Sequence, residues 1–203
     1  MIYRFFKRLF DVSASLFGLL ILLPFLLIIA LLVGLTSRGG VFYRQVRVGR
    51  RERHFKIIKF RTMVKNADKG KDGAITVAND ARVTRVGRVL RKLKLDELPQ
   101  LLNVLGGSMS LVGYRPEVPE YVELYNEEQR AIFVMRPGVT GLAALNYIDE
   151  AALLKDVEDT KQFYVDEIMP LKLAIELEYL QRAGFFYDIG VIFRTFFRIV
   201  SGR

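Results

Sequence analysis

The stretch VSASLFGLLILLPFLLIIALLVGLTS, residues 12–37, decides the architecture of this chain. It holds 26 consecutive residues without a charge, between Asp11 and Arg38. As a straight α-helix it would be about 39 Å long at ~1.5 Å per residue, which exceeds the roughly 30 Å hydrocarbon core of a bilayer. A domain of 203 residues has no core wide enough to surround such a helix. The segment therefore predicts a membrane anchor.

From the residues alone, this anchor could follow either of two paths in the membrane. Pro24 lies near its middle, and proline removes a backbone donor and crowds the preceding turn, which favours a break. Both flanks are basic, and basic flanks prefer the cytoplasmic side. A helix-break-helix hairpin places both flanks there. A kinked helix that spans the membrane, oriented by the more basic flank after Arg38, is the alternative.

The composition limits the chemistry that the rest of the chain can perform. Lys and Arg outnumber Asp and Glu by 31 to 22, which gives a formal charge of +9 and favours polyanionic partners. The absence of cysteine excludes disulfides, thiolate metal sites and a cysteine nucleophile. His54 is the single histidine and is interpreted as a hairpin-edge residue rather than a base. Catalysis must then rest on carboxylates, lysine, tyrosine or serine.

Residues 1–38 are predicted to form the membrane anchor, and residues 39–203 a mainly α-helical domain with one short β-hairpin. The hairpin is expected over 41–46 and 55–60, followed by a loop over 64–79. Helices are expected over 82–91, 98–105, 119–133, 150–163 and 170–182. The aromatic segment 185–200 carries two arginines at helical spacing. It is expected to be an amphipathic helix, either interfacial at the membrane or packed in the core.

The helix predicted over 82–91 carries an arginine every third residue, which we call the arginine stripe: Arg82, Arg85, Arg88 and Arg91. Asp96 and Glu97 follow it directly, before Pro99. Acidic residues at a helix start complement the helix dipole, and this structural interpretation is open. The other interpretation is a reactive pair. Nearby guanidinium groups lower a carboxyl pKa, and an ionised aspartate can attack phosphorus.

Further cationic residues accompany stiff turns along the chain. Arg115 lies in the sequence GYRP, and Arg136 begins the sequence RPGVTG that contains Thr140. A guanidinium held by a rigid turn is suited to an oxyanion, although taken singly each sequence is better explained by a purely structural turn. Lys59 and Arg61 lie at the end of the second predicted strand.

Together these motifs resemble the bacterial sugar transferase family, the small monotopic phosphoglycosyl transferases. The resemblance covers nearly the whole chain. It is carried by these sequences, in this order: KRLFD (7–11), Pro24, QVRVG (45–49), FKIIKFRTM (55–63), RVGRVLR (85–91), LDELPQLLNVL (95–105), MSLVG (109–113), Arg115-Pro116 and RPGVTGL (136–142).

The resemblance implies an activity and a location. Such enzymes transfer a sugar 1-phosphate from a UDP-sugar to a polyprenol phosphate, here expected to be undecaprenyl phosphate, and release UMP. This is the first membrane step of glycoconjugate or exopolysaccharide assembly. The implied anchor is a re-entrant helix with both ends in the cytoplasm, so that the catalytic domain lies on the cytoplasmic face of the bacterial inner membrane. Membrane lipids are expected partners, nucleic acid is not, and a homodimer is possible.

The resemblance also assigns roles to residues. Asp96 would be the nucleophile of a ping-pong reaction and would hold Mg²⁺, and Glu97 would position or deprotonate the partner. Arg115 would hold a phosphate. The other expected substrate-binding residues are Lys59, Arg61, Arg91, Arg136 and Thr140. The chain departs from the family pattern at Leu23, which leaves the angle of the hairpin open, and at Tyr114, which leaves the placement of Arg115 open. It also departs at Ser108 and Ala144, which leaves the identity of the sugar open.

A non-enzymatic function is the alternative. In that case the domain would be a membrane-tethered module that binds polyanions through the arginine stripe, with a strong salt dependence and no role for Asp96.

Overall fold

The apolar N-terminal segment forms one long helix, α1 (Ile2–Thr36), in the computed structural model, which describes residues 2–67, 77, 80–154 and 157–201. Within these residues, α1 is the one helix long and apolar enough to cross a membrane. Only 11% of its most apolar 18 residues are buried by the rest of the protein. The predicted long apolar N-terminal helix is therefore confirmed.

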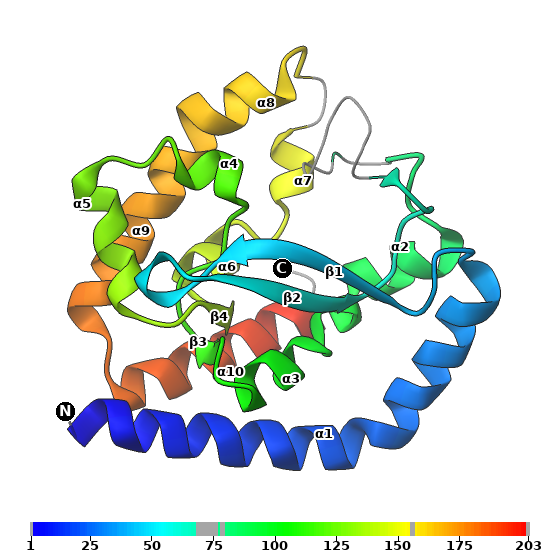
Figure 1. Ribbon diagram of the computed structural model, residues 1–203, viewed down its shortest axis with the longest axis horizontal. Helices are drawn as coiled ribbons and strands as arrows, with labels where there is room; N and C mark the ends of the chain where they lie inside the picture. The colour runs from blue at the N-terminus through cyan, green and yellow to red at the C-terminus, as the bar shows by residue number, and fades with distance from the viewer. Residues whose placement is uncertain (1, 68–76, 78–79, 155–156, 202–203) are drawn as a thin grey trace.

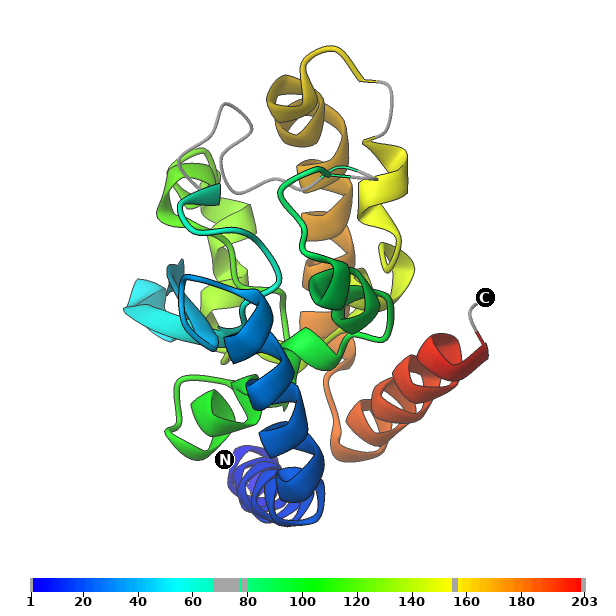
Figure 2. The same ribbon diagram turned by 90° about the vertical axis from the view of Figure 1, so that its right-hand side faces the viewer.

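The helix α1 changes direction along its length. Its first part runs beneath the domain, and its last part rises beside it (Figure 1), as the view from the right-hand side also shows (Figure 2). Pro24 lies inside the helix, which runs unbroken from Ile2 to Thr36. A bend of this kind is expected of a proline, which removes one helical hydrogen bond and crowds the preceding turn.

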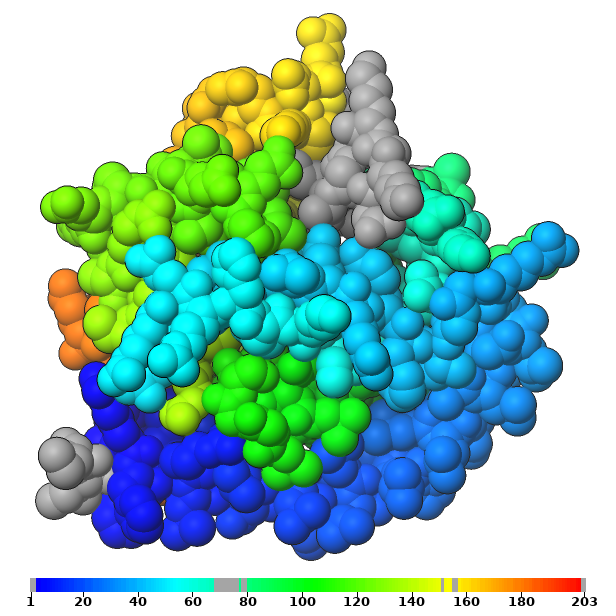
Figure 3. Space-filling model, viewed as in Figure 1, coloured from blue at the N-terminus to red at the C-terminus, as the bar shows by residue number. Residues whose placement is uncertain are grey.

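The predicted hairpin is confirmed, and its first strand extends two residues further than expected. β1 (Phe42–Val48) and β2 (His54–Phe60) pair antiparallel along their whole length. A single 3₁₀ turn, η1 (Arg50–Glu52), joins them. His54 is exposed at the turn end of the hairpin, as the sequence predicts. The hairpin crosses the middle of one face of the molecule, with α1 along the lower edge of that face (Figure 3).

The arginine stripe is only partly helical. The helix α2 spans Arg85–Lys92 rather than 82–91, because the side chain of Thr84 accepts a backbone hydrogen bond from the first turn and caps the helix there. Arg82 therefore precedes the helix, where it forms an ion pair of 2.6 Å with Asp80. Only the part of the stripe after Thr84 has helical spacing.

Two short helices follow α2, and the second of them matches the helix predicted over 98–105. The 3₁₀ helix η3 (Leu95–Glu97) leads into α3 (Gln100–Leu105). The chain then leaves α3 through Gly106 and Gly107, whose φ of 82° is left-handed and favours glycine. These elements hold the acidic pair on a tight connection between α2 and α3.

The single helix predicted over 119–133 is wrong. The segment forms α4 (Pro119–Val122), α5 (Glu127–Arg130) and the 3₁₀ helix η4 (Ala131–Val134). Asn126 is the reason, because its side chain forms a capping box with the third residue of α5 and so begins a new helix.

The single helix predicted over 150–163 is also divided. Its described parts are α7 (Glu150–Leu153) and α8 (Thr160–Phe163). Asp159 caps α8 by accepting a hydrogen bond from the backbone of Gln162. Residues 155–156 lie outside the described part of the chain, as do 68–76 and 78–79 of the predicted loop.

A short parallel sheet was not predicted. β3 (Ser110–Val112) pairs with β4 (Gly138–Thr140), and α6 (Leu142–Asn146) follows directly. A Cβ atom at Gly138 would lie 2.2 Å from the backbone nitrogen of Gly113, so the two segments approach this closely only with glycine. Strands of three residues are too short to give an alternating pattern in the sequence.

The C-terminal helices agree with the sequence prediction. α9 (Met169–Arg182) follows a π-helical turn, η5 (Tyr164–Ile168), and α10 (Phe185–Ser201) ends the described chain. The largest core cluster joins α9 and η5 to the segment between β3 and η4; its members include Tyr114, Tyr121, Phe133, Ile168 and Leu173. The outer side of α10 leaves large apolar side chains exposed, namely Phe186, Phe193, Phe196, Phe197 and Val200.

Two buried carboxylates fasten α1 to the domain. Asp11 accepts a hydrogen bond of 2.7 Å from Ser110 of β3. Asp188 of α10 accepts hydrogen bonds from Tyr3 at 2.9 Å and Lys7 at 2.5 Å. The first part of α1 is thereby fixed against β3 and α10.

Candidate active site

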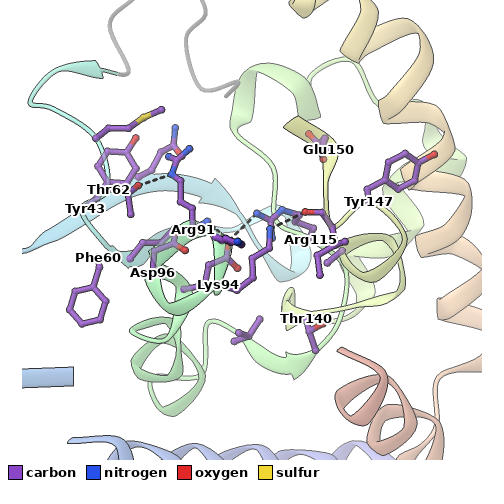
Figure 4. A pocket seen from close by; sticks show the side chains of 18 of the residues that line it. Tyr43, Phe60, Thr62, Arg91, Lys94, Asp96, Arg115, Thr140, Tyr147 and Glu150 are labelled. Atoms are coloured by element: carbon purple, nitrogen blue, oxygen red, sulfur yellow. Dashed lines mark hydrogen bonds and ion pairs between the residues drawn. The ribbon is translucent and has the colours of Figure 1, made fainter. Parts of the chain in front are cut away.

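Asp96 and Glu97 lie on the connection between α2 and α3. Lys94, immediately before η3, has a left-handed backbone (φ 54°), which turns the chain sharply out of α2. Both acidic residues then line a cavity of about 950 Å³. Figure 4 views this cavity, with Asp96 and Lys94 on one side, Glu150 and Tyr147 on the other, and Arg115 between them.

Glu97 is tightly held by two cations. Its Oε1 accepts a hydrogen bond of 2.6 Å from Lys59 Nζ and one of 3.0 Å from Arg115 Nη2. Lys59 comes from β2 and Arg115 from the segment after β3, so three distant parts of the chain meet here. All three side chains are also wall residues of the cavity.

Asp96 is buried but open to the cavity. Only 7% of the residue is exposed, and it lines the cavity wall. No side chain among the described residues forms a hydrogen bond or ion pair with its carboxylate, although several cations surround it. Asp96 is thus a carboxylate that an incoming ligand can approach, whereas Glu97 is already engaged.

The two adjacent carboxyl groups have opposite pKa shifts. Burial alone would raise the pKa of Glu97, but the charges of Arg115 and Lys59 outweigh it and hold the pKa well below its usual value. Burial, together with the charge of Glu97, raises the pKa of Asp96 despite the surrounding cations. The sequence-based expectation of a lowered pKa is therefore wrong for Asp96, because desolvation dominates at its position.

Two cations of the arginine-rich segment face the same cavity. Arg91 lines it and donates a hydrogen bond of 2.8 Å to Thr62 Oγ1, a contact drawn in Figure 4. Lys94 also lines it and donates to the backbone oxygen of Ile148 at 3.0 Å. This side of the cavity is consequently cationic around Asp96, as a site for phosphate groups requires.

The remaining predicted site residues differ in their placement. Arg61 lines the cavity, but its guanidinium donates to the backbone oxygens of Gly40 and Phe42 at 3.1 and 3.2 Å. Thr140 lines the opposite wall. Arg136 is not part of the wall formed by the described residues; its Nε donates 2.9 Å to the backbone oxygen after α3, at Gly107. The structure therefore brings Arg61 and Thr140 to the site and leaves Arg136 outside it.

A second charged cluster on the far wall was not predicted. Glu117 accepts hydrogen bonds from Arg47 Nη1 at 3.3 Å and from the hydroxyl of Tyr164 at 2.7 Å. Lys172 donates to the same hydroxyl at 3.0 Å and to Glu150 at 2.8 Å. We call these five residues the paired cluster, because each charge in it faces an opposite one.

The sequence carries only a weak signal for the paired cluster. Its members come from β1, the segment after Arg115, α7, η5 and α9, so no local motif unites them. Lys172 lies in an otherwise amphipathic helix, and its burial depends on contacts that span the chain. Arg47 lies within the QVRVG motif of the resemblance and Glu117 directly follows Arg115-Pro116, but the resemblance assigns a role to neither.

The donor set agrees with a magnesium ion held jointly with a substrate. Among the described residues there is no group of three or more carboxylate or histidine side chains suited to a metal. Mg²⁺ in phosphate-handling sites commonly takes one or two carboxylates and completes its coordination with substrate phosphates and water. The open Asp96 carboxylate would supply the first kind of ligand.

Comparison with known proteins identifies the family. A family model described as bacterial sugar transferase matches residues 2–202. The chain belongs to the bacterial sugar transferase family. Within this family, exopolysaccharide production protein ExoY of Rhizobium meliloti is 36% identical over 93% of this chain and 83% of its own length. The UDP-glucose:undecaprenyl-phosphate glucose-1-phosphate transferase of Caulobacter vibrioides is 39% identical over 93% of this chain and 67% of its own length.

Other bacterial sugar transferases similar to this chain are longer. The UDP-N-acetylgalactosamine-undecaprenyl-phosphate N-acetylgalactosaminephosphotransferase of Aeromonas hydrophila is 36% identical over 99% of this chain. The matched region is 45% of that relative, and 36% of an undecaprenyl-phosphate glucose phosphotransferase from Komagataeibacter xylinus. The chain thus spans less than half the length of these two relatives.

The four departures from the family pattern occupy different surroundings in this bacterial sugar transferase. Leu23 is exposed on α1, and Ser108 Oγ donates to the backbone oxygen of Asn103 at 3.1 Å. Tyr114 is buried, with its ring edge-on to a phenylalanine of the core. Ala144 alone lines the cavity. Of the four, Ala144 is placed to affect which ligand fits.

Proposed function

We propose that this protein transfers a sugar 1-phosphate from a UDP-sugar to undecaprenyl phosphate and releases UMP. The observation that carries the proposal is the open carboxylate of Asp96, next to the fixed anion Glu97 and facing a cavity with cationic walls. The names of the relatives from Caulobacter and Aeromonas describe the same type of reaction. The product would begin the assembly of an exopolysaccharide or another glycoconjugate.

Asp96 is the nucleophile in this proposal. Its ionised carboxylate forms a bond to the β-phosphorus of the donor, and the bond from that phosphorus to the oxygen of the α-phosphate breaks, so that UMP leaves. A phosphate oxygen of undecaprenyl phosphate then attacks the same phosphorus, and the bond to Asp96 breaks. The raised pKa of Asp96 supports this role, since a more basic carboxylate is a better nucleophile once ionised.

Glu97 acts as a fixed negative charge that positions its neighbours. Its pKa is held well below the usual range by Arg115 and Lys59, so it is a poor base near neutral pH. Of the two roles that the family resemblance suggests, positioning is the one that the electrostatics favour. Arg115, fixed on Glu97, presents its other donors toward a donor phosphate.

Asp96 is also the residue to hold Mg²⁺, together with the phosphates of the donor. When bound there, the ion supplies compensation for the negative charge of the diphosphate. Arg91 and Lys94 add positive charge on the same side of the cavity.

The anchor is proposed to be re-entrant, with both ends on the cytoplasmic face of the bacterial inner membrane. The bend in α1, its exposed apolar surface and the basic residues on both sides of it support this path. The exposed phenylalanines of α10 would lie at the acyl boundary of the same membrane. Asp96 would then be reachable by both a lipid phosphate and a soluble nucleotide sugar.

UMP release tests the reaction directly. The purified full chain in lipid nanodiscs, supplied with Mg²⁺ and undecaprenyl phosphate, is expected to release UMP from at least one UDP-sugar of a panel. Asp96→Asn should abolish release, whereas Asp166→Asn, a matched change at an exposed aspartate of η5, should leave it unchanged. Turnover that survives Asp96→Asn would overturn the nucleophile assignment.

Cysteine labelling tests the path of the anchor, because the chain contains no cysteine of its own. Ile2→Cys in membrane vesicles should react with an impermeant reagent supplied from the cytoplasmic side. Labelling only from the opposite side would show a spanning helix instead.

The alternative of a polyanion-binding module receives less support. Arg82 is paired with Asp80, and Arg91 turns toward the cavity, which leaves only Arg85 and Arg88 of the arginine stripe exposed. Such a divided stripe lacks the continuous basic surface that non-specific polyanion binding uses.

A further inference from the structure

The helix α9 carries a buried carboxylate directly beneath Arg115. Glu176 is 3% exposed, and it lies one turn after Lys172 of the paired cluster, on the same face of the helix. This face packs against the segment between β3 and α4, which has no regular structure of its own. Backbone groups in such a segment need partners from elsewhere in the fold.

Glu176 supplies one of these partners. Its Oε1 accepts a hydrogen bond of 3.0 Å from the backbone nitrogen of Arg115. The space around this contact is tight, because a Cβ atom at Gly141 would lie 2.1 Å from the backbone oxygen of Gly113 and 3.9 Å from Glu176 Oε1. Arg115 is therefore held at its backbone by α9 and at its guanidinium by Glu97.

The second carboxylate oxygen of Glu176 takes no part in the hydrogen bond from Arg115, so a purely structural contact would not require it. Its Oε2 is buried without a hydrogen-bond partner among the described residues, and burying an unsatisfied polar atom costs stability. Burial raises the pKa of Glu176 to about 7, although the hydrogen bond from Arg115 and the charges of Lys172 and Arg115 act in the opposite direction. The hydroxyl of Tyr114, another group near it, is also buried and unpartnered.

We propose that Glu176 is a positioning residue that sets the place of Arg115, and through Arg115 the geometry of Glu97 beside the nucleophile Asp96. The contacts form one continuous path from α9 through Arg115 to Glu97. Glu176 does not itself line the cavity among the described residues, so it acts through Arg115 and not on a ligand. The catalytic consequence of this inference rests on the proposed function.

Hydrogen exchange measures the hold on Arg115 without any substrate. Glu176→Met keeps the length of the side chain and removes the acceptor, and the amide of Arg115 should then exchange at least about tenfold faster. Glu176→Gln retains an acceptor oxygen and should keep the exchange within about threefold of the wild-type protein. Glu178→Gln, at an exposed glutamate two residues further along α9, is the matched control and should change nothing.

A double-mutant cycle measures the effect on the reaction. Glu176→Met should lower kcat/KM for UMP release by roughly 10- to 100-fold, but by less than about threefold when Arg115 is already alanine. Glu176→Gln should rescue most of the activity. If the methionine variant does not fold, Glu176→Leu also removes the acceptor and should give the same faster exchange of Arg115, and unchanged exchange in it would overturn the inference.

The possible outcomes separate the two proposals. A wild-type protein that releases UMP from no donor overturns the proposed function, whereas the exchange of Arg115 still reports whether Glu176 holds it. An active protein in which Glu176→Met leaves exchange unchanged, or lowers activity equally with and without Arg115, overturns the role of Glu176.

Discussion

Asp96 and the paired cluster around Glu117 lie on the walls of one cavity. They differ in whether their carboxylate oxygens have hydrogen-bond partners. Glu117 accepts hydrogen bonds from Arg47 and Tyr164, and Lys172 closes the cluster from α9. Asp96 is more deeply buried than Glu117 but has no such partner among the described residues. The comparison teaches that burial with partners gives a fixed charge, whereas burial without them gives a carboxylate free to react.

The largest expected effect is a loss of activity that distinguishes Asp96 from Glu117 of the paired cluster. Asp96→Asn should lower UMP release by on the order of 10⁴-fold or more, because the amide cannot serve as the nucleophile. The substitution should not lower Tm, because the carboxyl group that it removes is buried without a partner and does not stabilise the fold. Glu117→Gln should have the reverse profile, with a loss of activity of only about tenfold and a clear decrease of Tm. Equal losses of activity with unchanged Tm in both variants would contradict the distinction.

The next effect concerns the charge that fixes Glu97. Arg115→Ala should lower kcat/KM by roughly 100-fold, the usual cost of losing one donor to a developing charge. The pKa of the carboxyl pair should rise, because a positive charge that lowers it is gone. On acidification, activity should therefore be lost at a higher pH than in the wild-type protein. Arg85→Ala, at an exposed arginine of α2, is the control; a pH profile that moves in neither variant would count against the fixed charge.

A smaller effect tests the stability of the paired cluster. Lys172→Met leaves Glu150 and Glu117 without their buried cation and should cost about 3 kcal/mol of unfolding free energy. Lys161→Met breaks only an exposed ion pair with Glu120 and should change it by less than about 0.5 kcal/mol. Thermal unfolding in detergent compares the two variants, and similar Tm values would mean that the paired cluster contributes little.

The smallest effect is a pH dependence due to Glu176. Its folded pKa of about 7 exceeds its ordinary value of 4.5, so the folded protein binds the additional proton between these values and stability falls as pH rises through them. At about 1.4 kcal/mol per pKa unit the fall is at most roughly 3 kcal/mol. Glu176→Gln removes it, so the Tm of this variant relative to wild type should be higher at pH 8 than at pH 5. A constant difference would show that Glu176 does not titrate in this range.

The features of the fold that depend on neighbouring residues in the chain could be predicted from the sequence. The apolar anchor, the hairpin, α9 and α10 have strong periodic or compositional signals, and each lies close to where it was predicted. The helix predicted over 119–133 was wrong because a single capping residue, Asn126, outweighs the general helical pattern. The sheet of β3 and β4 was missed because its two strands are too short to show a period and join residues far apart in the chain.

The sequence by itself determined the family motifs, the apolar N-terminal helix and the adjacent carboxylates Asp96 and Glu97, because each of these depends on residues that are close together in the chain. Only the tertiary structure decided which carboxylate is open and which is paired. Glu97 meets Lys59 and Arg115 through contacts between β2, η3 and the segment after β3, and Glu176 reaches Arg115 from α9. Desolvation and charge pairing depend on such distant neighbours, so the properties that separate the proposed nucleophile Asp96, the paired Glu97 and the proposed positioning residue Glu176 arise only when the chain is folded.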